Sequence, residues 1–171
     1  MAGPAGRLIA AGCAGALLIA AGPAAPDPVA ALAGRYDGRH AVRPHDGTDT
    51  AETIVEIVPV APDAAYVRVH YVSYGNGICG LHAVARREGR RLVYRQSSPA
   101  GGSACVLAVA REGNRLRLDD GGTCRDFCGV TASLSGVALP FARRRPITYM
   151  RRLKDSREFR DALGDWHRPR A

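Results

Sequence analysis

The feature that most constrains the fold is a series of short alternating segments between Tyr66 and Cys128. Apolar and polar side chains alternate in runs such as Val67–Tyr71 and Arg91–Arg95, and tight glycine turns such as Glu88-Gly89-Arg90 separate the runs. This alternation has the two-residue period of a strand with one buried face, and turns of this kind join antiparallel strands. The stretch therefore predicts an antiparallel meander.

Further segments extend the same pattern on both sides of this stretch. Gly34-Arg35-Tyr36 is predicted to open the first strand, and Glu52–Val60 is the segment with the highest β propensity. Gly129–Phe141 is predicted to form a last hairpin that turns near Ser135-Gly136, with Pro146–Met150 as an extension. We therefore expect a mainly β fold, an antiparallel meander closed or nearly closed into a small barrel of about eight strands.

One segment beyond the meander has helical periodicity. Between Asp155 and Trp166 the apolar residues Phe159, Leu163 and Trp166 fall on one face, and Glu158 follows Asp155 at capping-box spacing. We therefore predict a single C-terminal amphipathic helix. Its apolar face either packs on the barrel or is available to a partner.

The first 24 residues have the pattern of an export signal. Arg7 is the single charge among them, and the apolar run from Leu8 to Ala21 is of signal-peptide length, too short to span a bilayer well. Small residues before Ala24 favour cleavage there, and Ala31 is the alternative. A lipid anchor on Cys13 is a minor alternative to cleavage.

These features divide the chain into four parts. Residues 1–24 are expected to be the signal peptide, 25–32 a disordered leader, 33–150 a disulfide-stapled β-barrel domain, and 151–171 the C-terminal helix with a basic tail. The protein is expected to be secreted or periplasmic, with membrane contact only through the signal segment.

Four cysteines follow the signal segment: Cys79, Cys105, Cys124 and Cys128. An even number in an exported chain predicts two disulfides. In an up-and-down meander all four would lie at one end of the barrel, so the topology does not choose among the three pairings. We favour Cys79–Cys105 with Cys124–Cys128. The alternative is a zinc site that adds His82, although the spacings match no common zinc finger.

Positive charge is concentrated at the C-terminal end. The whole chain has a net charge of +8, and one unit less without Arg7. Basic segments attract anionic partners. A candidate partner-binding surface combines basic and helical residues: Arg143, Arg144, Arg145, Arg151, Arg152, Arg157, Phe159, Arg160, Leu163 and Trp166. The expected partner is an envelope protein or an anionic cell-envelope polymer, and outside the cytoplasm nucleic acid is not expected. A plain solvated face is the alternative.

The sequence contains no catalytic constellation. The serines of Ser97–Ser103 lack a G-x-S-x-G context, and Asp119-Asp120 lacks the spacing of a calcium loop. A hydrolase would need His40, His70 or His82 beside a serine or an acid in space. We therefore expect no catalytic residue, no metal and no cofactor.

The overall plan resembles a known group of proteins. An export signal, a Gly-x-Tyr opening strand and a cysteine-stapled β-meander over residues 33–141 make the chain similar to small periplasmic β-barrel proteins of bacteria, including the lysozyme-inhibitor families. The resemblance implies a non-catalytic binding or inhibitor protein at the cell envelope. A lipocalin-like carrier of a small molecule is the alternative, and a small hydrolase is less favoured.

Overall fold

A computed structural model describes residues 26–43, 47, 49–74, 77–96, 104–129 and 131–168. The predicted signal peptide with Cys13 lies outside the described residues, as does the serine-containing loop of residues 97–103. None of the helices in the described ranges is long and apolar enough to cross a membrane.

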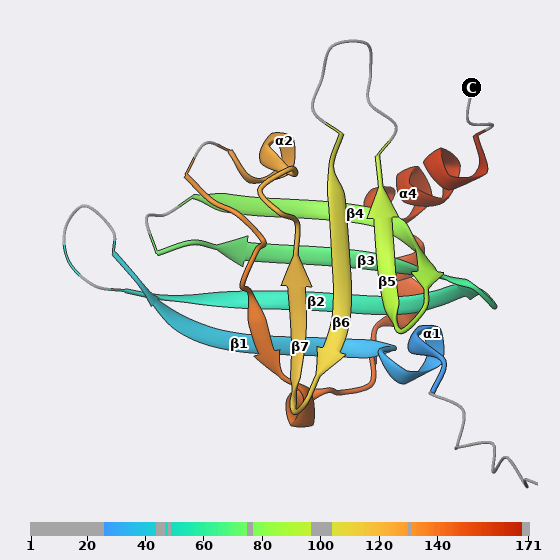
Figure 1. Ribbon diagram of the computed structural model, residues 1–171, viewed down its shortest axis with the longest axis horizontal. Helices are drawn as coiled ribbons and strands as arrows, with labels where there is room; N and C mark the ends of the chain where they lie inside the picture. The colour runs from blue at the N-terminus through green and yellow to red at the C-terminus, as the bar shows by residue number, and fades with distance from the viewer. Residues whose placement is uncertain are drawn as a thin grey trace, which may run out of the picture.

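Eight antiparallel strands form one sheet in which every strand pairs with its neighbours in the sequence (Figure 1). The strands are β1 (Gly34–Val42), β2 (Asp49–Ala61), β3 (Ala64–Val72), β4 (Ile78–Glu88), β5 (Arg91–Arg95), β6 (Val106–Glu112), β7 (Arg115–Asp119) and β8 (Ala138–Pro140). The predicted meander of eight strands is therefore confirmed.

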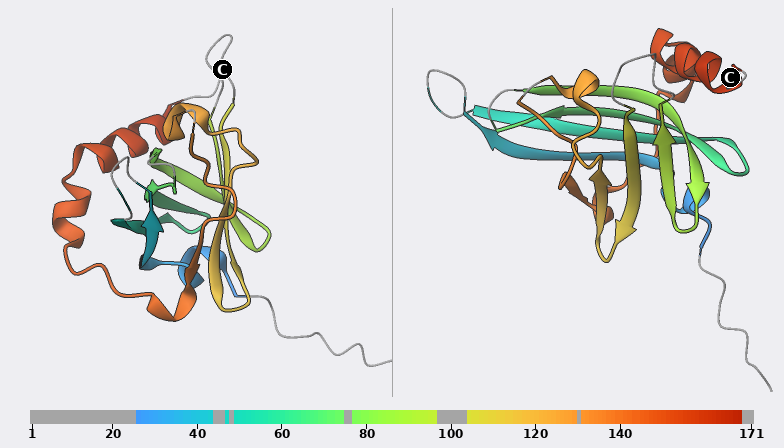
Figure 2. Two further views of the ribbon diagram at one scale, coloured as in Figure 1. Left: turned by 90° about the vertical axis from the view of Figure 1, so that its left-hand side faces the viewer. Right: turned by 45° about the horizontal axis from the view of Figure 1, so that its top comes forward.

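The sheet bends into a nearly closed barrel with two layers. The long strands β1–β4 form one layer, and β5–β8 run crosswise over it (Figures 1 and 2). Next to the seam between β1 and β8, a backbone pair joins β1 to the segment after η1: Arg35 N donates to Arg145 O at 2.8 Å, and Arg145 N donates to Arg35 O at 2.9 Å. Gly38 leaves room at this seam, because a Cβ there would lie 2.7 Å from the Leu139 side chain.

The inward-facing residues of both layers fill the barrel. Apolar positions at alternate residues of the strands meet in one core cluster, whose largest fully buried members include Tyr36, Ile57, Leu81, Leu107 and Leu116. This is the burial pattern that the alternation predicts. The interior is a packed core.

A short helix, α1 (Pro28–Ala31), precedes the first strand. Val29 and Leu32 are buried in the barrel core, and the carbonyl of Leu32 accepts a 2.9 Å hydrogen bond from the Tyr36 hydroxyl. The expectation of a disordered leader therefore does not hold from Pro28 onward, because its two large apolar side chains find a buried site.

Both disulfides lie at one end of the barrel, as expected, but the favoured pairing was wrong. The structure joins Cys79 to Cys128 and Cys105 to Cys124. The reason is the one-turn helix α2 (Arg125–Cys128), which directs Cys124 toward the start of β6 and Cys128 toward β4. Local closeness of Cys124 and Cys128 in the sequence did not decide the pairing.

The region after β7 departs from the predicted last hairpin. Only three residues, Ala138–Pro140, pair with β7 as β8, and a 3-10 helix, η1 (Phe141–Arg143), follows at once. Pro146–Met150 adds no strand. Past the Arg35–Arg145 pair, the chain instead leaves the sheet edge and runs over the outside of the barrel.

This outer segment, residues 145–167, is called the C-terminal wrap (Figure 2). It contains α3 (Met150–Lys154) and the predicted helix, observed as α4 (Arg157–His167). Ser156 caps α4 by accepting a hydrogen bond from Phe159 N at 3.2 Å, so the cap falls one residue later than expected. A second apolar cluster forms where α4 covers β3 and β4.

Candidate functional site

The structure divides the predicted partner-binding surface into two places. Arg143 and Arg144 lie near the turn from β6 to β7, since Phe141 N bonds to Asn114 O in that turn, and Arg145 pairs with Arg35 of β1 where the C-terminal wrap begins. The other predicted residues belong to the C-terminal wrap on the outer side of β2–β4.

On the wrap, the predicted apolar stripe is largely covered. Phe159 is buried, with its ring centroid 4.6 Å from that of Tyr66, and Leu163 and Trp166 are half-buried in the same cluster. Arg86 of β4 lies over the Trp166 ring at 5.6 Å. This stripe therefore packs on the barrel.

The basic residues of the wrap differ in how they are engaged. Arg157 pairs with Asp161 at 3.3 Å, and Arg160 donates to the carbonyl of Asp155 at 2.7 Å. Arg152 lies 5.4 Å from the Tyr149 ring centre, whereas the exposed Arg151 has no ion pair among the described residues. Helix α4 also carries acidic residues, so the wrap is a surface of mixed charge.

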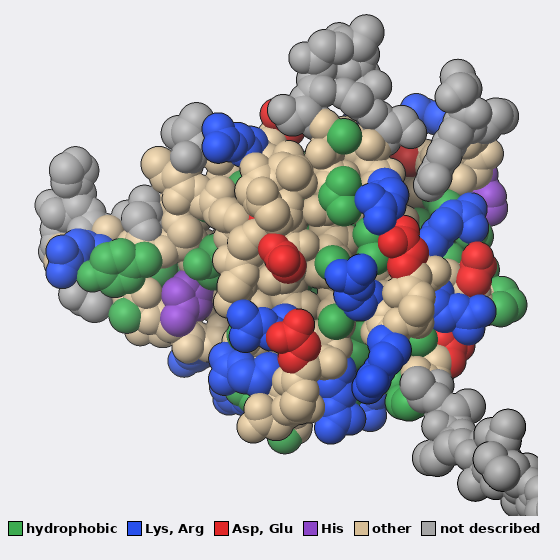
Figure 3. Space-filling model, viewed as in Figure 1, with side chains coloured by type: hydrophobic (Ala, Val, Ile, Leu, Met, Phe, Trp, Pro, Cys, Tyr) green, Lys and Arg blue, Asp and Glu red, His purple; other side chains and the backbone are tan. Residues whose placement is uncertain are grey.

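The barrel end, in contrast, carries four exposed arginines, two of which lie over one aromatic ring. Arg111 is the next-to-last residue of β6, Arg115 begins β7, and Arg143 and Arg144 lie in and directly after η1; we call these four the arginine cluster. The guanidinium carbons of Arg111 and Arg144 lie 4.2 and 5.1 Å from the centre of the Phe141 ring. Basic side chains accordingly gather along the lower edge of Figure 3.

Backbone carbonyls hold three of these guanidinium groups in place. Arg111 Nε donates to Gly113 O at 2.9 Å, an Arg115 amino group donates to Ala138 O at 2.5 Å, and an Arg144 amino group donates to Ala31 O at 2.6 Å. A guanidinium has five N–H donors. Each of these therefore keeps further donors for a ligand.

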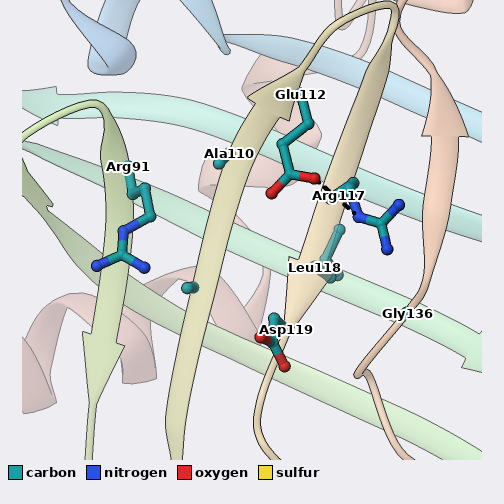
Figure 4. Close-up of a pocket in the computed structure, with 8 residues that line it drawn as sticks. Arg91, Ala110, Glu112, Arg117, Leu118, Asp119 and Gly136 are labelled. Carbon is teal, nitrogen blue, oxygen red and sulfur yellow. Dashed lines mark ion pairs between the residues drawn. The ribbon is translucent and has the colours of Figure 1, made fainter.

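No carboxylate neutralises this cluster. None of its four arginines forms an ion pair among the residues that the structure describes, although most other barrel arginines do. Glu112 faces Arg115 across the β6–β7 pair but forms its ion pair with Arg117 at 3.1 Å (Figure 4), and Asp37 pairs with Arg145. The cluster therefore presents uncompensated positive charge.

The positive charge of the arginine cluster also affects the pKa of a tyrosine inside the barrel. Burial raises the pKa of the Tyr36 hydroxyl to about 12, while the positive charges of Arg144 and Arg111 act in the opposite direction. The Tyr36 ring lies 5.8 Å from that of Phe141. Arg111 and Arg144 thus lie over a pair of aromatic rings at this end of the barrel.

A buried carboxylate attaches the C-terminal wrap to the barrel. Glu56 of β2 is completely buried, lies 2.6 Å from Arg68 Nε and 3.4 Å from an Arg35 amino group, and accepts a hydrogen bond from the Tyr149 hydroxyl. Arg35 also donates to that hydroxyl at 2.6 Å. Contact with Glu56 raises the pKa of Tyr149, after the larger effect of burial.

Among the residues that the structure describes, histidines, serines and acids do not assemble into a second site. His40 makes hydrogen bonds with Val72 O at 2.5 Å and Thr53 Oγ1 at 3.3 Å, while His70 and His82 are exposed. Asp120 accepts hydrogen bonds from Ser133 and Ser135 at 2.8 and 2.7 Å, which makes it a structural turn residue. Within the described ranges, no group of three potential metal ligands is present.

Sequence reasoning found only half of the arginine cluster. Arg143 and Arg144 belong to the conspicuous basic C-terminal third, but Arg111 and Arg115 stand in an ordinary hairpin whose turn, Glu112–Asn114, carries no functional signal. The pairing of β7 with β8 and the hydrogen bond between Phe141 N and Asn114 O, at 2.8 Å, bring the two pairs together.

The sequence matches no known protein family, and comparisons with curated proteins and with solved structures find no similar protein. The site is therefore interpreted from its own geometry.

Proposed function

We propose that this is an exported, non-catalytic binding protein whose arginine cluster holds an anionic polymer of the cell envelope. The observation that carries the proposal is the presence of four exposed arginines at this end of the barrel, two of them over the ring of Phe141, with no carboxylate paired to any of the four in the described part of the chain. Guanidinium groups bind phosphate, sulfate and carboxylate through paired N–H donors. An anion bound among these guanidinium groups reduces the repulsion between their positive charges.

Two further features support the proposal. The disulfides bear on the compartment, and the contacts of the histidines bear on catalysis. Two disulfides fit an oxidising location outside the cytoplasm. The ring of His40 is occupied by Val72 O and Thr53, and no histidine in the described ranges is bonded to a serine hydroxyl. These features favour binding over hydrolysis.

The filled interior gives no support to the alternative of a small-molecule carrier. Fully buried side chains from both layers, among them Tyr36, Leu81 and Leu107, occupy the space that a lipocalin uses for its ligand. A ligand would therefore bind to the outside of the barrel.

The proposal is tested by removing the charge of the cluster and comparing it with an equal loss elsewhere. The site variant is Arg111→Gln/Arg115→Gln/Arg143→Gln. The matched control is Arg39→Gln/Arg90→Gln/Arg125→Gln, three exposed arginines without an ion pair among the described residues. Retention on immobilised heparin and co-sedimentation with long-chain polyphosphate are measured against salt concentration, and circular dichroism verifies the folds.

We expect the site variant to elute at clearly lower salt than the control, because a fixed cluster binds better than the same charge spread out. Equal shifts for the two variants would mean that net charge alone causes retention. That result, or no salt-sensitive retention of the wild type, overturns the proposal.

A further inference from the structure

The short helix α1 lies beside β5 at one end of the barrel (Figure 1). Its apolar side chains are part of the core, since Val29 is 3% exposed and Leu32 is 2% exposed. The start of the helix is held by Asp27, whose Oδ1 accepts a hydrogen bond from Val29 N at 3.1 Å and lies 3.5 Å from an Arg87 amino group of β4. Residues 27–32 are therefore an integral part of the folded domain.

This matters for where the predicted signal peptide is removed. The sequence offers two sites, after Ala24 and after Ala31, and at both the last residue before the cut is small, as the cleavage pattern requires. The pattern alone does not choose between them. The two cuts leave different chains, because a cut after Ala24 keeps α1, whereas a cut after Ala31 removes α1 and makes Leu32 the first residue.

A cut after Ala31 would introduce a charge next to the barrel core. The amide nitrogen of Leu32 now ends α1 by donating to Pro28 O at 3.0 Å. After the cut this nitrogen would be an ammonium group, and its acceptor would be gone. A charged group is far more costly to remove from water than an amide. Leu32 could therefore keep its buried position only with an unpaired charge at the margin of the core.

The same cut would remove three further contacts. Val29 would leave the core, and Arg87 would lose its ion pair with Asp27. An amino group of Arg144, which donates to Ala31 O at 2.6 Å, would lose its acceptor. A cut after Ala24 removes none of these contacts, because Asp27 is the first residue to take part in them.

We propose that the precursor is processed after Ala24, so that the mature protein begins at Ala25 and α1 is its first helix. This inference rests on the export that the proposed function assumes, and it is independent of the ligand. The signal peptidase of the exporting cell hydrolyses the bond between Ala24 and Ala25. Water supplies the hydroxyl group of the new Ala24 carboxyl group and a proton to the Ala25 nitrogen, which becomes the new amino terminus.

The experiment determines where the exported chain begins. The full-length chain is produced in a bacterium, and N-terminal sequencing and intact mass are measured on the exported fraction. Ala24→Gln and Ala31→Gln form a matched pair, since each replaces the small residue before one cut by the same larger side chain. We expect the wild type and Ala31→Gln to begin at Ala25, and Ala24→Gln to accumulate as uncut precursor.

The site and the export fail in different ways. An exported chain that begins at Leu32, or at a lipid-modified Cys13, overturns the proposed site while export stands. Processing that is blocked by Ala31→Gln and unaffected by Ala24→Gln has the same meaning. A wild-type precursor that stays uncut in the cytoplasm overturns export itself, and the processing site with it.

Stability tests the physical reason separately. Chains that cover residues 25–171 and 32–171 are compared by thermal unfolding with both disulfides formed, and a chain of residues 27–171 is the control because it keeps every contact described above. We expect the control to match the 25–171 chain and the 32–171 chain to unfold about 5–10 °C lower, or not to fold, since it loses the burial of Val29 and the contacts of Asp27. Equal midpoints for all three chains would overturn the argument for the site.

Discussion

The hydroxyl of Tyr149 donates a hydrogen bond to Oε1 of Glu56, which lies 93 residues earlier in the chain. Glu56 faces outward from β2, yet it is completely buried because the C-terminal wrap covers it. The wrap therefore supplies both the cover that removes water from the carboxylate and a donor that replaces water. Arg35 and Arg68 supply the compensating charge.

Removing this donor tests how firmly the wrap is attached. We expect Tyr149→Phe to lower the free energy of unfolding by about 1–2 kcal/mol, because the buried carboxylate loses a hydrogen-bond partner. Urea denaturation gives the value, and limited trypsin digestion at the exposed Arg151 and Lys154 reports loosening of the wrap. Tyr74→Phe, at a tyrosine that is 54% exposed, is the control. Equal stability of the two variants would show that the contact contributes nothing.

The covered stripe of α4 gives a second prediction. Phe159→Ala should cost about 3–5 kcal/mol of stability, since it leaves a cavity beneath α4 against Tyr66. Arg160→Ala, at an exposed position on the same helix, should change stability by no more than about 0.5 kcal/mol. Chemical denaturation of both variants measures the two losses in stability. If Phe159→Ala costs no more stability than Arg160→Ala, Phe159 does not pack firmly on the barrel and is available to a partner.

A third prediction concerns stability in acid. Burial raises the pKa of Asp120, but hydrogen bonds from Ser135, Ser133 and the backbone outweigh it, and the pKa is lowered overall. A lowered folded-state pKa stabilises the protein above the unfolded pKa, which is about 4, and this contribution is lost as the pH falls through the folded value.

Asp120→Asn should therefore be less stable than the wild type at pH 7, by about 1 kcal/mol. The difference should shrink as the pH falls below about 4. Denaturant midpoints measured from neutral to acid pH give the curve, and Asp126→Asn, at an exposed position in α2, is the comparison. A difference that does not depend on pH would refute the role of the charge.

The disulfides give a fourth prediction. Cys79–Cys128 closes a segment with a sequence separation of 49, and Cys105–Cys124 one of 19. By the entropy of loop closure, replacing both cysteines of the longer link by serine should cost about 4 kcal/mol, against about 3 kcal/mol for the shorter. Thermal and urea unfolding of the two double-serine variants test the order. Peptide mapping under non-reducing conditions tests the pairing itself.

The strands could be predicted because their signal is local. Each alternating run needs only its own residues and its flanking turns, and Arg91–Arg95 was predicted with the observed bounds of β5. The helix at Phe159 was found in the same way. Its cap was misplaced by one residue, because Asp155 and Ser156 are both favourable capping residues.

Features that depend on the folded arrangement could not be predicted. The cysteine pairing follows from the direction of α2, which no alternation encodes. The leader was expected to be disordered because it is rich in proline and alanine, yet Val29 and Leu32 are buried in the barrel core. The arginine cluster needs η1 to meet the β6–β7 turn, a contact between segments distant in the sequence.

The order of the strands has a consequence for how this chain can assemble. Because each strand pairs only with its predecessor and its successor, a chain that is synthesised from its N-terminus finds every new strand's partner already in place. The closing seam and both sulfur links depend on residues from Cys124 onward. The sheet can thus form one strand at a time, and the C-terminal part of the chain then closes the barrel and completes both disulfides.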